Sequence, residues 1–259
     1  NYEWHTEAMD RAMLGGGLDD VGIGVLYGLY DYHYDTVALL MHAEHLEAVA
    51  GVGPHTISFP RLLPAEGVDR SSFPYLVNDR DFKKIVATIR LAVPYTGLIL
   101  TTRESVEFRN ELLEIGVSQM SAGSSVGVGG YAKRKTVDEE GVEEKPQFYL
   151  ADHRKPIDVV KGLVRDGYIP SYCTACYREG RTGDRFMPLA KSGQIKNCCL
   201  PNALLTFEEY LQDYADSELM EMGRNMIDRE IQNVPVERQR TRSIEYLRRI
   251  RSGERDLRF

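Results

Sequence analysis

All four cysteines of the 259-residue chain fall between residues 173 and 199. Cys173 and Cys176 form a CxxC pair, and Cys198 and Cys199 follow as a second pair further along the chain. Thiolates bind soft metals, and a CxxC turn directs two sulfurs toward one point. Residues 1–5 lack the basic and then apolar pattern of a signal peptide, so the clustering indicates metal binding rather than disulfides.

Three kinds of site are compatible with this spacing. A cluster held by three cysteines, with one iron left open, uses three thiols and leaves one spare. A zinc site needs four ligands in a tetrahedron, but using both Cys198 and Cys199 on one ion would strain the backbone, and residues 173–199 contain no histidine. A thioredoxin-like redox pair leaves the second cysteine pair unexplained. Spacing alone favours the cluster and zinc about equally, with the redox pair third.

The first half of the chain alternates apolar runs with segments of helical spacing. The predicted strands cover 21–29, 56–62, 97–102 and 117–122, and the predicted helices between them cover 36–50, 80–93 and 104–115. This alternation implies an α/β fold with parallel strands and helical crossovers. Four such units fit half of an eight-unit barrel and fit a doubly wound open sheet equally well.

The second half reads differently. Residues 133–147 are charged with almost nothing apolar, which predicts a solvated loop. A helix is expected over 157–164. Thr206 and Glu209 have the spacing of a capping box and predict a helix that begins there. The Arg-rich residues 229–259 are typical of a solvated helical face.

Composition and charge exclude several classes of protein. Hydrophobic residues make up 42% and charged residues 27% of the chain, which rules out global disorder. The net charge of −7 gives no indication of a nucleic acid partner. No run approaches the ~20 apolar residues that a membrane span needs. We therefore expect a cytoplasmic protein with no membrane partner.

Four segments carry a resemblance to a known family: 21–31, 57–62, 121–124 and 172–178. Together with a CX2CX22C motif, matched by Cys173, Cys176 and Cys199, they make the chain similar to the radical S-adenosylmethionine tyrosine lyases that mature FeFe-hydrogenase. The related 2-iminoacetate synthases of thiamine biosynthesis share much of the barrel. The resemblance covers essentially the whole chain and corresponds to the C-terminal part of the maturase.

The resemblance implies a fold and a reaction. Residues 1–152 would form the second half of a (β/α)8 TIM-type radical SAM barrel, and residues 153–259 a mainly helical domain that holds an auxiliary 4Fe–4S cluster. One 4Fe–4S cluster of the family cleaves S-adenosylmethionine to a radical that breaks the Cα–Cβ bond of tyrosine, giving p-cresol and dehydroglycine. Dehydroglycine then yields CO and cyanide. An extra iron, bridged to the auxiliary cluster by cysteine, carries these ligands away as an iron carbonyl cyanide synthon.

The resemblance also implies partners and ligands. Tyrosine and S-adenosylmethionine would be the substrates, and the other hydrogenase maturation proteins, including the GTPase scaffold, would be the partners. Cys173, Cys176 and Cys199 would hold the auxiliary cluster. His55, just before a predicted strand, would bind the extra iron, since imidazole suits iron. From the residues alone, an ordinary loop histidine is the stronger reading of His55.

Other candidate residues lie along the predicted strands. Arg61, Arg103 and Ser121 lie at the C-terminal ends of three strands, where barrel enzymes place their chemistry. Either arginine could bind the carboxylate of tyrosine or S-adenosylmethionine by a two-point contact, and pairing with a neighbouring acid is about equally probable. The run Gly22-Ile23-Gly24 corresponds to the strand that supports S-adenosylmethionine in this superfamily, and a closely packed strand is the alternative.

The chain departs from the family pattern in one respect. It contains no CX3CX2C motif for the radical-generating cluster. We expect that motif upstream of Asn1, so that this chain alone should not cleave S-adenosylmethionine. Two rival functions stay open from the sequence. One is a 2-iminoacetate synthase, which would make no CO, and the other is a non-catalytic zinc-binding module.

Overall fold

The computed structural model describes residues 1–65, 67–127, 130 and 148–259. These residues form two compact units, Asn1–His153 and Arg154–Phe259, which are described separately below. The sequence placed a domain boundary between 152 and 153, and the independence of two such domains stays a prediction. The loop predicted over 133–147 lies outside the described residues.

A parallel sheet forms the centre of the first unit. Its strands are β1 (Gly22–Gly24), β2 (Thr56–Ser58), β3 (Gly97–Leu100) and β4 (Gln119–Met120), and they lie side by side in chain order. Every pairing is parallel, with Ile23 opposite Ile57 and Ile57 opposite Leu98. This confirms the predicted α/β fold with parallel strands, although each strand is shorter than the apolar run that predicted it.

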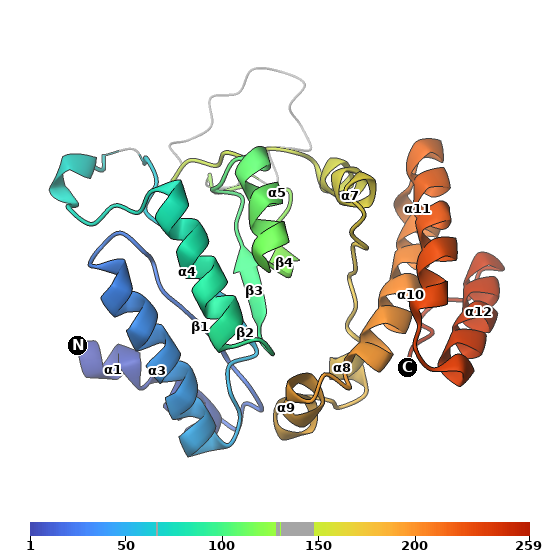
Figure 1. Cartoon of the computed structure of the whole chain (residues 1–259), viewed down its shortest axis with the longest axis horizontal. Helices are drawn as coiled ribbons and strands as arrows, with labels where there is room; N and C mark the ends of the chain where they lie inside the picture. Colours follow the sequence, from blue (N-terminus) through green and yellow to red (C-terminus); the bar gives the residue numbers. More distant parts are fainter. Residues whose placement is uncertain (66, 128–129, 131–147) are drawn as a thin grey trace. The chain divides into compact units, whose positions relative to one another are not determined.

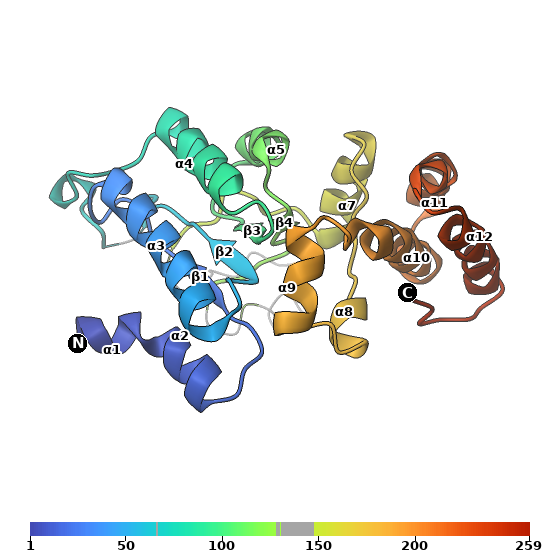
Figure 2. The ribbon, with the colours of Figure 1, turned by 60° about the horizontal axis from the view of Figure 1, so that its bottom comes forward.

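Three helices connect the strands and lie along one face of the sheet (Figures 1 and 2). They are α3 (Tyr32–Ala50), α4 (Asp79–Ala92) and α5 (Val106–Ile115). Asp31, Asn78 and Ser105 cap their N-termini, each accepting a hydrogen bond from a backbone N–H of the first turn. α3 ends at Gly51, which adopts a left-handed conformation (φ 72°) that a side chain would disfavour.

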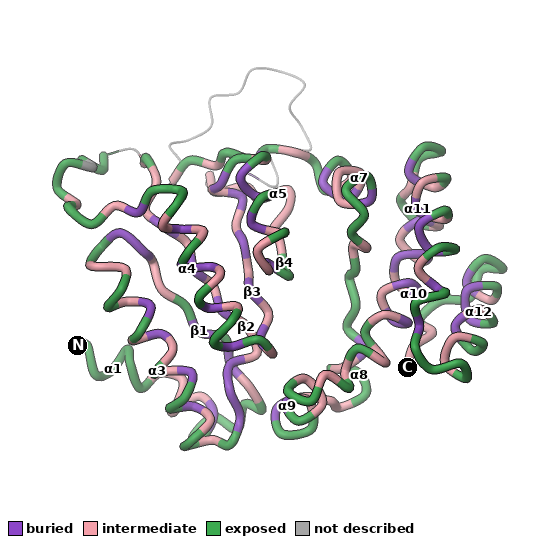
Figure 3. The backbone as a smooth tube through the Cα atoms, in the orientation of Figure 1, coloured by how far each residue is buried: buried purple, intermediate pink, exposed green. Residues whose placement is uncertain are grey.

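The two faces of the sheet differ in chemistry. Ile23, Ile57, Leu98 and Leu100 form a buried row (Figure 3). The alternate positions are only partly buried or exposed and, apart from Ile99, are small or polar: Gly22, Gly24, Thr56, Ser58, Gly97, Ile99 and Gln119. Since successive side chains of a strand point to opposite faces, one face is core and the other is lined mainly by small and polar groups. Only one face of the sheet is therefore continuously apolar.

Short helical segments precede the sheet and lie between its elements. Residues 2–15 form α1 (Tyr2–Thr6), α2 (Ala8–Asp10) and the π-helical η1 (Arg11–Gly15). The 3-10 turn η2 (Arg70–Ser72) lies between β2 and α4. No helix of the described residues is long and apolar enough to cross a membrane. The expected cytoplasmic location stays a prediction.

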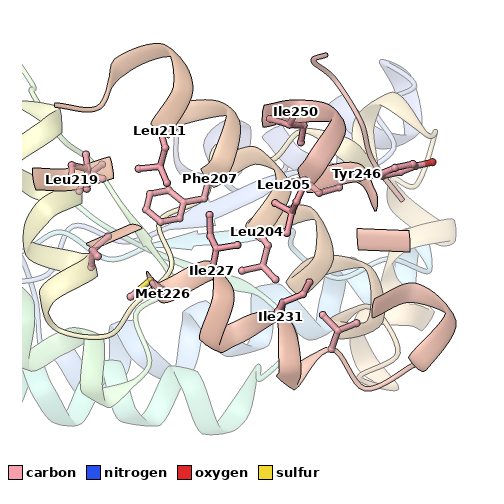
Figure 4. Close-up of a cluster of buried hydrophobic side chains, with 14 residues drawn as sticks. Leu204, Leu205, Phe207, Leu211, Leu219, Met226, Ile227, Ile231, Tyr246 and Ile250 are labelled. Carbon is pink, nitrogen blue, oxygen red and sulfur yellow. The ribbon is translucent and has the colours of Figure 1, made fainter. Parts of the chain in front are cut away.

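The second unit is helical. Its helices are α7 (Pro156–Arg165), α8 (Ala175–Arg178), α9 (Gly183–Lys191), α10 (Lys196–Tyr214), α11 (Ser217–Glu230), η3 (Ile231–Asn233) and α12 (Glu237–Arg251). Leu204, Phe207 and Leu211 of α10 pack with residues of α7, α11, η3 and α12 in one hydrophobic cluster (Figure 4). Glu208 is also buried there and accepts hydrogen bonds from Arg224 and Arg251, so its charge is compensated.

The second unit differs from its sequence prediction in two respects. Thr206 does not begin a helix, because α10 starts at Lys196 and continues through Pro201. The Thr206 hydroxyl donates to the carbonyl of Asn202 at 2.9 Å, the backbone bond that Ser and Thr make inside helices. The segment between the two cysteine pairs, for which the sequence had indicated no helix, contains α9.

Candidate metal centre

The cysteines lie on two segments of the second unit. Cys173 precedes α8, and Cys176 lies within it. Cys198 and Cys199 lie in the first turns of α10. All four thiols are free. The turn after the CxxC pair is closed by the N–H of Arg181, which donates to the carbonyl of Cys176 at 2.7 Å.

The CxxC segment packs directly on α10. Ser171 and Thr206 share a hydrogen bond of 3.1 Å between their hydroxyls, and the ring of Tyr172 stacks on that of Tyr210 with centroids 5.3 Å apart. Inside the turn, the N–H of Ala175 donates to the sulfur of Cys173 at 3.4 Å. These contacts bring segments more than 20 residues apart in the sequence side by side.

The thiols are close enough to affect one another's charge. Desolvation is the largest cause that raises the pKa of Cys199, to about 11, and the neighbouring Cys176, Cys173 and Cys198 raise it further. Desolvation also raises the pKa of Cys173. Both residues are exposed when the whole residue is counted, so the desolvation is local to the sulfur. Bound cations would offset this penalty, because metals stabilise thiolates.

Helix geometry separates Cys198 from Cys199. Adjacent residues of an α-helix point about 100° apart, so one of the two faces a given neighbour better than the other. Cys199 interacts electrostatically with both members of the CxxC pair. Its surroundings therefore match the assignment of Cys199 as the third ligand, which stays a prediction.

The structure does not choose between a single ion and a cluster. Among the described residues, no group of three or more His, Cys, Asp or Glu side chains is placed to hold one ion. A four-iron cube spreads its sulfur ligands further apart than a tetrahedral zinc ion does. The three-cysteine cluster and the zinc module both stay predictions.

His55 lies at the opposite edge of the sheet from the predicted substrate residues. It comes directly before β2, and its backbone bonds Val21 and Gly97, so the neighbouring strands fix its position. Its Nδ1 lies 3.2 Å from an oxygen of Asp20, within ion-pair distance but without the alignment of a strong hydrogen bond. A carboxylate beside Nδ1 favours the proton there and leaves Nε2 with its lone pair.

Arg61 forms ion pairs with acidic residues of its own chain. Its Nε and one terminal nitrogen donate to the two oxygens of Glu104 at 2.9 and 2.7 Å, and Asp79 lies 2.7 Å away. The guanidinium also stacks over the rings of Phe82 and Phe108. These contacts favour the alternative of an internal ion pair over a substrate contact for Arg61.

Arg103 is better placed to bind an anion. It lines a cavity of about 330 Å³ together with Arg61, Glu104 and Tyr149. Its guanidinium lies 3.7 Å from the ring centre of Phe148, and within the described residues it makes no ion pair. Arg103 is partly buried, and this desolvation lowers the pKa of its guanidinium. An anionic group entering the cavity would offset that cost.

Ser121 and the glycine run lie outside that cavity. The backbone of Ser121 is fixed on both sides, since its N–H donates to Leu100 and its carbonyl accepts from Arg109. A methyl group on Gly22 would meet the Thr56 hydroxyl at 2.6 Å, and one on Gly24 the Ser58 carbonyl at 2.5 Å. Close packing therefore explains both glycines without a ligand, and their role toward S-adenosylmethionine stays a prediction.

One pair at this edge was missed from the sequence. Arg109 of α5 and Asp152 are both buried and form an ion pair. The N–H of Asp152 donates to the carbonyl of Thr102, which joins the 151–152 segment to the end of β3. Forty-three residues separate the partners, so only the helical position of Arg109, beside the apolar Phe108 and Leu112, could have suggested its burial.

Comparison with known proteins adds the family. Residues 58–169 match the model of the Biotin and Thiamin Synthesis associated domain. The 2-iminoacetate synthases of Escherichia coli K12 and Salmonella typhimurium LT2 are each 31% identical over 173 residues, which is 66% of this chain and 43% of theirs. The crystal structure of HydG, a maturase of the FeFe-hydrogenase, is 56% identical with a TM-score of 0.92 and covers 100% of this chain. These matches identify the chain as a HydG-like fragment that is similar to part of an FeFe-hydrogenase maturase and related to the 2-iminoacetate synthases.

A second HydG structure agrees. HydG from Carboxydothermus hydrogenoformans is 40% identical over 95% of this chain, with a TM-score of 0.73. The chain spans 55% and 51% of the two solved HydG chains, and less than half of the curated synthases. The predicted resemblance to the FeFe-hydrogenase maturase is thereby confirmed.

Proposed function

We propose that this chain is the part of a HydG-like tyrosine lyase that completes the barrel and holds the auxiliary cluster. In this proposal tyrosine is cleaved to p-cresol and dehydroglycine, and dehydroglycine gives the CO and cyanide of an iron synthon for FeFe-hydrogenase. Residues 1–152 would be the second half of a (β/α)8 barrel and residues 153–259 the auxiliary-cluster domain.

One observation carries the proposal. The three thiols of the CX2CX22C motif lie on two segments that pack against each other, in a chain that is 56% identical to HydG over its whole length. The face of the sheet opposite the core also supports it. A catalytic barrel needs an interior with room for substrates, and apart from Ile99 the strand residues on that face are small or polar.

Each candidate residue has a distinct task in this proposal. Cys173, Cys176 and Cys199 would hold a 4Fe–4S cluster, and Cys198 would stay a free thiol. With three protein ligands, such a cluster supplies one open iron at which cysteine and small ligands can bind. His55 would offer Nε2 to the extra iron, and Asp20 would keep the proton on Nδ1.

The opposite edge of the sheet would bind the substrates. Arg103 would hold the carboxylate of tyrosine or S-adenosylmethionine by two parallel hydrogen bonds. The phenyl ring of Phe148 would orient its guanidinium. The paired Arg61 and Glu104 would shape the wall of the cavity without carrying net charge into it.

Product analysis tests the proposal. The full-length protein that contains this chain is incubated without oxygen with tyrosine, S-adenosylmethionine, a reductant, iron and cysteine. We expect p-cresol, cyanide and CO. Formation of none of these by protein with both clusters assembled would refute the function.

A second candidate is supported by the family model and the curated relatives. As a 2-iminoacetate synthase, the protein would release p-cresol and dehydroglycine but neither CO nor cyanide. The same experiment separates the two, because p-cresol without CO is the result expected of the synthase. The Cys199→Ser variant gives a further check, since a HydG-like protein should keep p-cresol formation and lose CO.

A further inference from the structure

Residues 254–259 follow α12 and lie across both segments that carry the cysteines. Leu257 and Phe259 anchor this stretch by packing on the hydrophobic cluster, and the ring of Phe259 lies 5.6 Å from that of Tyr246. We call residues 254–259 the clasp. Its polar groups point to the CxxC segment on one side and to α10 on the other.

The first set of contacts reaches the CxxC segment. Asp256 pairs with Arg178, the last residue of α8. Arg258 donates to Glu179 at 2.7 Å, and Arg181 donates to the carbonyl of Phe259. Three of the four residues from Arg178 to Arg181 are therefore bonded to the clasp.

The second set reaches α10. The buried Asn202, three residues after Cys199, bonds the backbone of Phe259 twice, accepting from its N–H at 2.9 Å and donating to its carbonyl at 3.2 Å. The N–H of Asp256 donates to Glu209 at 2.6 Å. Arg255 pairs with Asp213 at 2.6 Å. Phe259 thus links Asn202 and Arg181, one from each cysteine-bearing segment.

Two features show that these contacts are needed. α8 has only four residues, and Ala175 is its one buried residue, so it cannot be stable by itself. Asp256 is the sole non-glycine residue with a positive φ (68°) in the described part of the chain. Such a conformation is unfavourable and persists where its surroundings fix it, as Arg178 and Glu209 do here.

We infer that the clasp is a positioning element for the cluster site: through Asn202, Arg178 and Arg181 it holds the CxxC pair at a set distance from Cys199. This inference rests on the proposed function for the identity of the group, but the clasp itself is a property of the chain alone. Within α8 only Ala175 is buried, and the direct contacts of this segment with α10 come from Ser171 and Tyr172, before the helix, so the clasp supplies the contacts after it. Loss of the clasp should free the CxxC segment while leaving the helical core folded.

Two variants test the clasp in the full-length protein. Arg178→Ala removes one exposed ion pair, and we expect amide exchange across 173–182 in metal-free protein to rise by about threefold. Asn202→Leu removes two buried hydrogen bonds at similar volume, and we expect a rise of about tenfold. After reconstitution with iron and sulfide, we compare how fast a chelator removes the iron whose binding depends on Cys199. Release should be faster in Arg178→Ala than in the unmodified protein, and fastest in Asn202→Leu. Arg178→Lys should restore most of the protection.

A matched control is available in the same unit. Arg165 is also an exposed arginine paired with a carboxylate, that of Glu218, but it lies on α7. Arg165→Ala should leave amide exchange across 173–182 and iron release unchanged.

Unchanged amide exchange in Asn202→Leu, or an equal rise in Arg165→Ala, would overturn the inference that the clasp positions the CxxC segment. If Asn202→Leu does not fold, the comparison of amide exchange in Arg178→Ala and Arg178→Lys tests the clasp instead. Protein that binds no iron at Cys199 would refute the proposed function, while the metal-free exchange would still decide for or against the clasp.

Discussion

Charged side chains at the sheet edge of the first unit are buried in pairs, whereas the cysteines of the second unit lie outside its hydrophobic core. Arg61 with Glu104, and Arg109 with Asp152, are each buried on both sides and come from elements that the sheet already holds. The cysteine segments are joined instead by partly exposed ion pairs and hydrogen bonds, most of them to residues 254–259.

This difference has a physical consequence. Buried ion pairs in a rigid frame are costly to break but insensitive to salt. Exposed pairs are individually weak and are screened by salt, so a site held by several of them can loosen without global unfolding. In the proposed function, iron and sulfide enter the cysteine site after folding, and the second arrangement would permit this.

The largest effect should come from the ligands themselves. Cys199→Ser should abolish the auxiliary cluster, because a hydroxyl is a poor ligand for cluster iron. Iron and sulfide analysis with electron paramagnetic resonance measures this. Cys198→Ser is the matched variant, one residue away on the same helix, and should keep the cluster. Auxiliary-cluster spectra that survive in Cys199→Ser would mean that the third ligand has been assigned wrongly.

The buried pair of the first unit should be the most costly to break. Arg109→Leu leaves the carboxylate of Asp152 buried without its partner and should lower the free energy of unfolding by about 3–5 kcal/mol. Urea denaturation followed by circular dichroism measures the change. Lys83→Leu breaks the exposed pair with Glu111 that joins α4 and α5, and should cost about 1 kcal/mol or less. Equal effects would remove the contrast between buried and exposed pairs.

Packing in the second unit can be tested at a glycine. Gly223 faces α10, and an added methyl group would lie 2.7 Å from Leu211 and 3.1 Å from Phe207. Gly223→Ala should therefore destabilise the unit by about 1–3 kcal/mol through overpacking. Gly162→Ala on α7 meets only the flexible end of Arg154, and should be neutral or stabilising by up to about 1 kcal/mol. Thermal unfolding distinguishes the two, and a stabilised Gly223→Ala would show that this core is loosely packed.

A smaller effect is expected near His55. Asp20→Asn removes the negative charge beside Nδ1 and should weaken iron binding at His55 by about tenfold, a typical loss for a partner that orients a metal ligand. Titration with ferrous iron, monitored by Mössbauer spectroscopy, measures the affinity. Asp19→Asn serves as the neighbouring control. The same affinity in Asp20→Asn and the unmodified protein would argue against an orienting role.

The smallest effect concerns exposed charges and pH. Lys161 lowers the pKa of Asp216 and of Glu218 by hydrogen bonding. A carboxyl group with a depressed pKa in the folded state contributes stability above its unfolded pKa, and loses it as pH falls through the folded value. The difference in Tm between the unmodified protein and Lys161→Met should thus be small at pH 7 and vanish below about pH 3. A difference that grows on acidification would contradict this sign.

Some of the architecture follows from local pattern. The apolar runs and helical spacing predicted every β strand and the helices between them, because period and capping residues act over a few positions. Strand ends were predicted too long, since hydrogen bonding to a neighbour decides where a strand stops. The capping box at Thr206 failed for a similar reason, because α10 had already begun ten residues earlier. α8 and α9 were missed since the glycines and proline around them resemble a loop.

The candidate site could also be predicted only in part. The cysteine spacing indicated a metal site and left a three-thiol cluster and a zinc ion about equally favoured, and the resemblance carried by short motifs then favoured the cluster. The choice between a free and a paired arginine could not be predicted. Arg61 and Arg103 occupy equivalent places after successive strands, yet only Arg61 finds two acids, one of them 43 residues away.

The sequence by itself determined which chemistry the chain can support, because thiol number and spacing are properties of the chain, and it determined the order of its strands and helices. The tertiary structure alone decided which charges neutralise one another, that α8 is bonded to residues 254–259, and that Phe259 links the two cysteine segments through Arg181 and Asn202. Those outcomes depend on contacts between residues far apart in sequence, whose distances are set only when the whole unit packs.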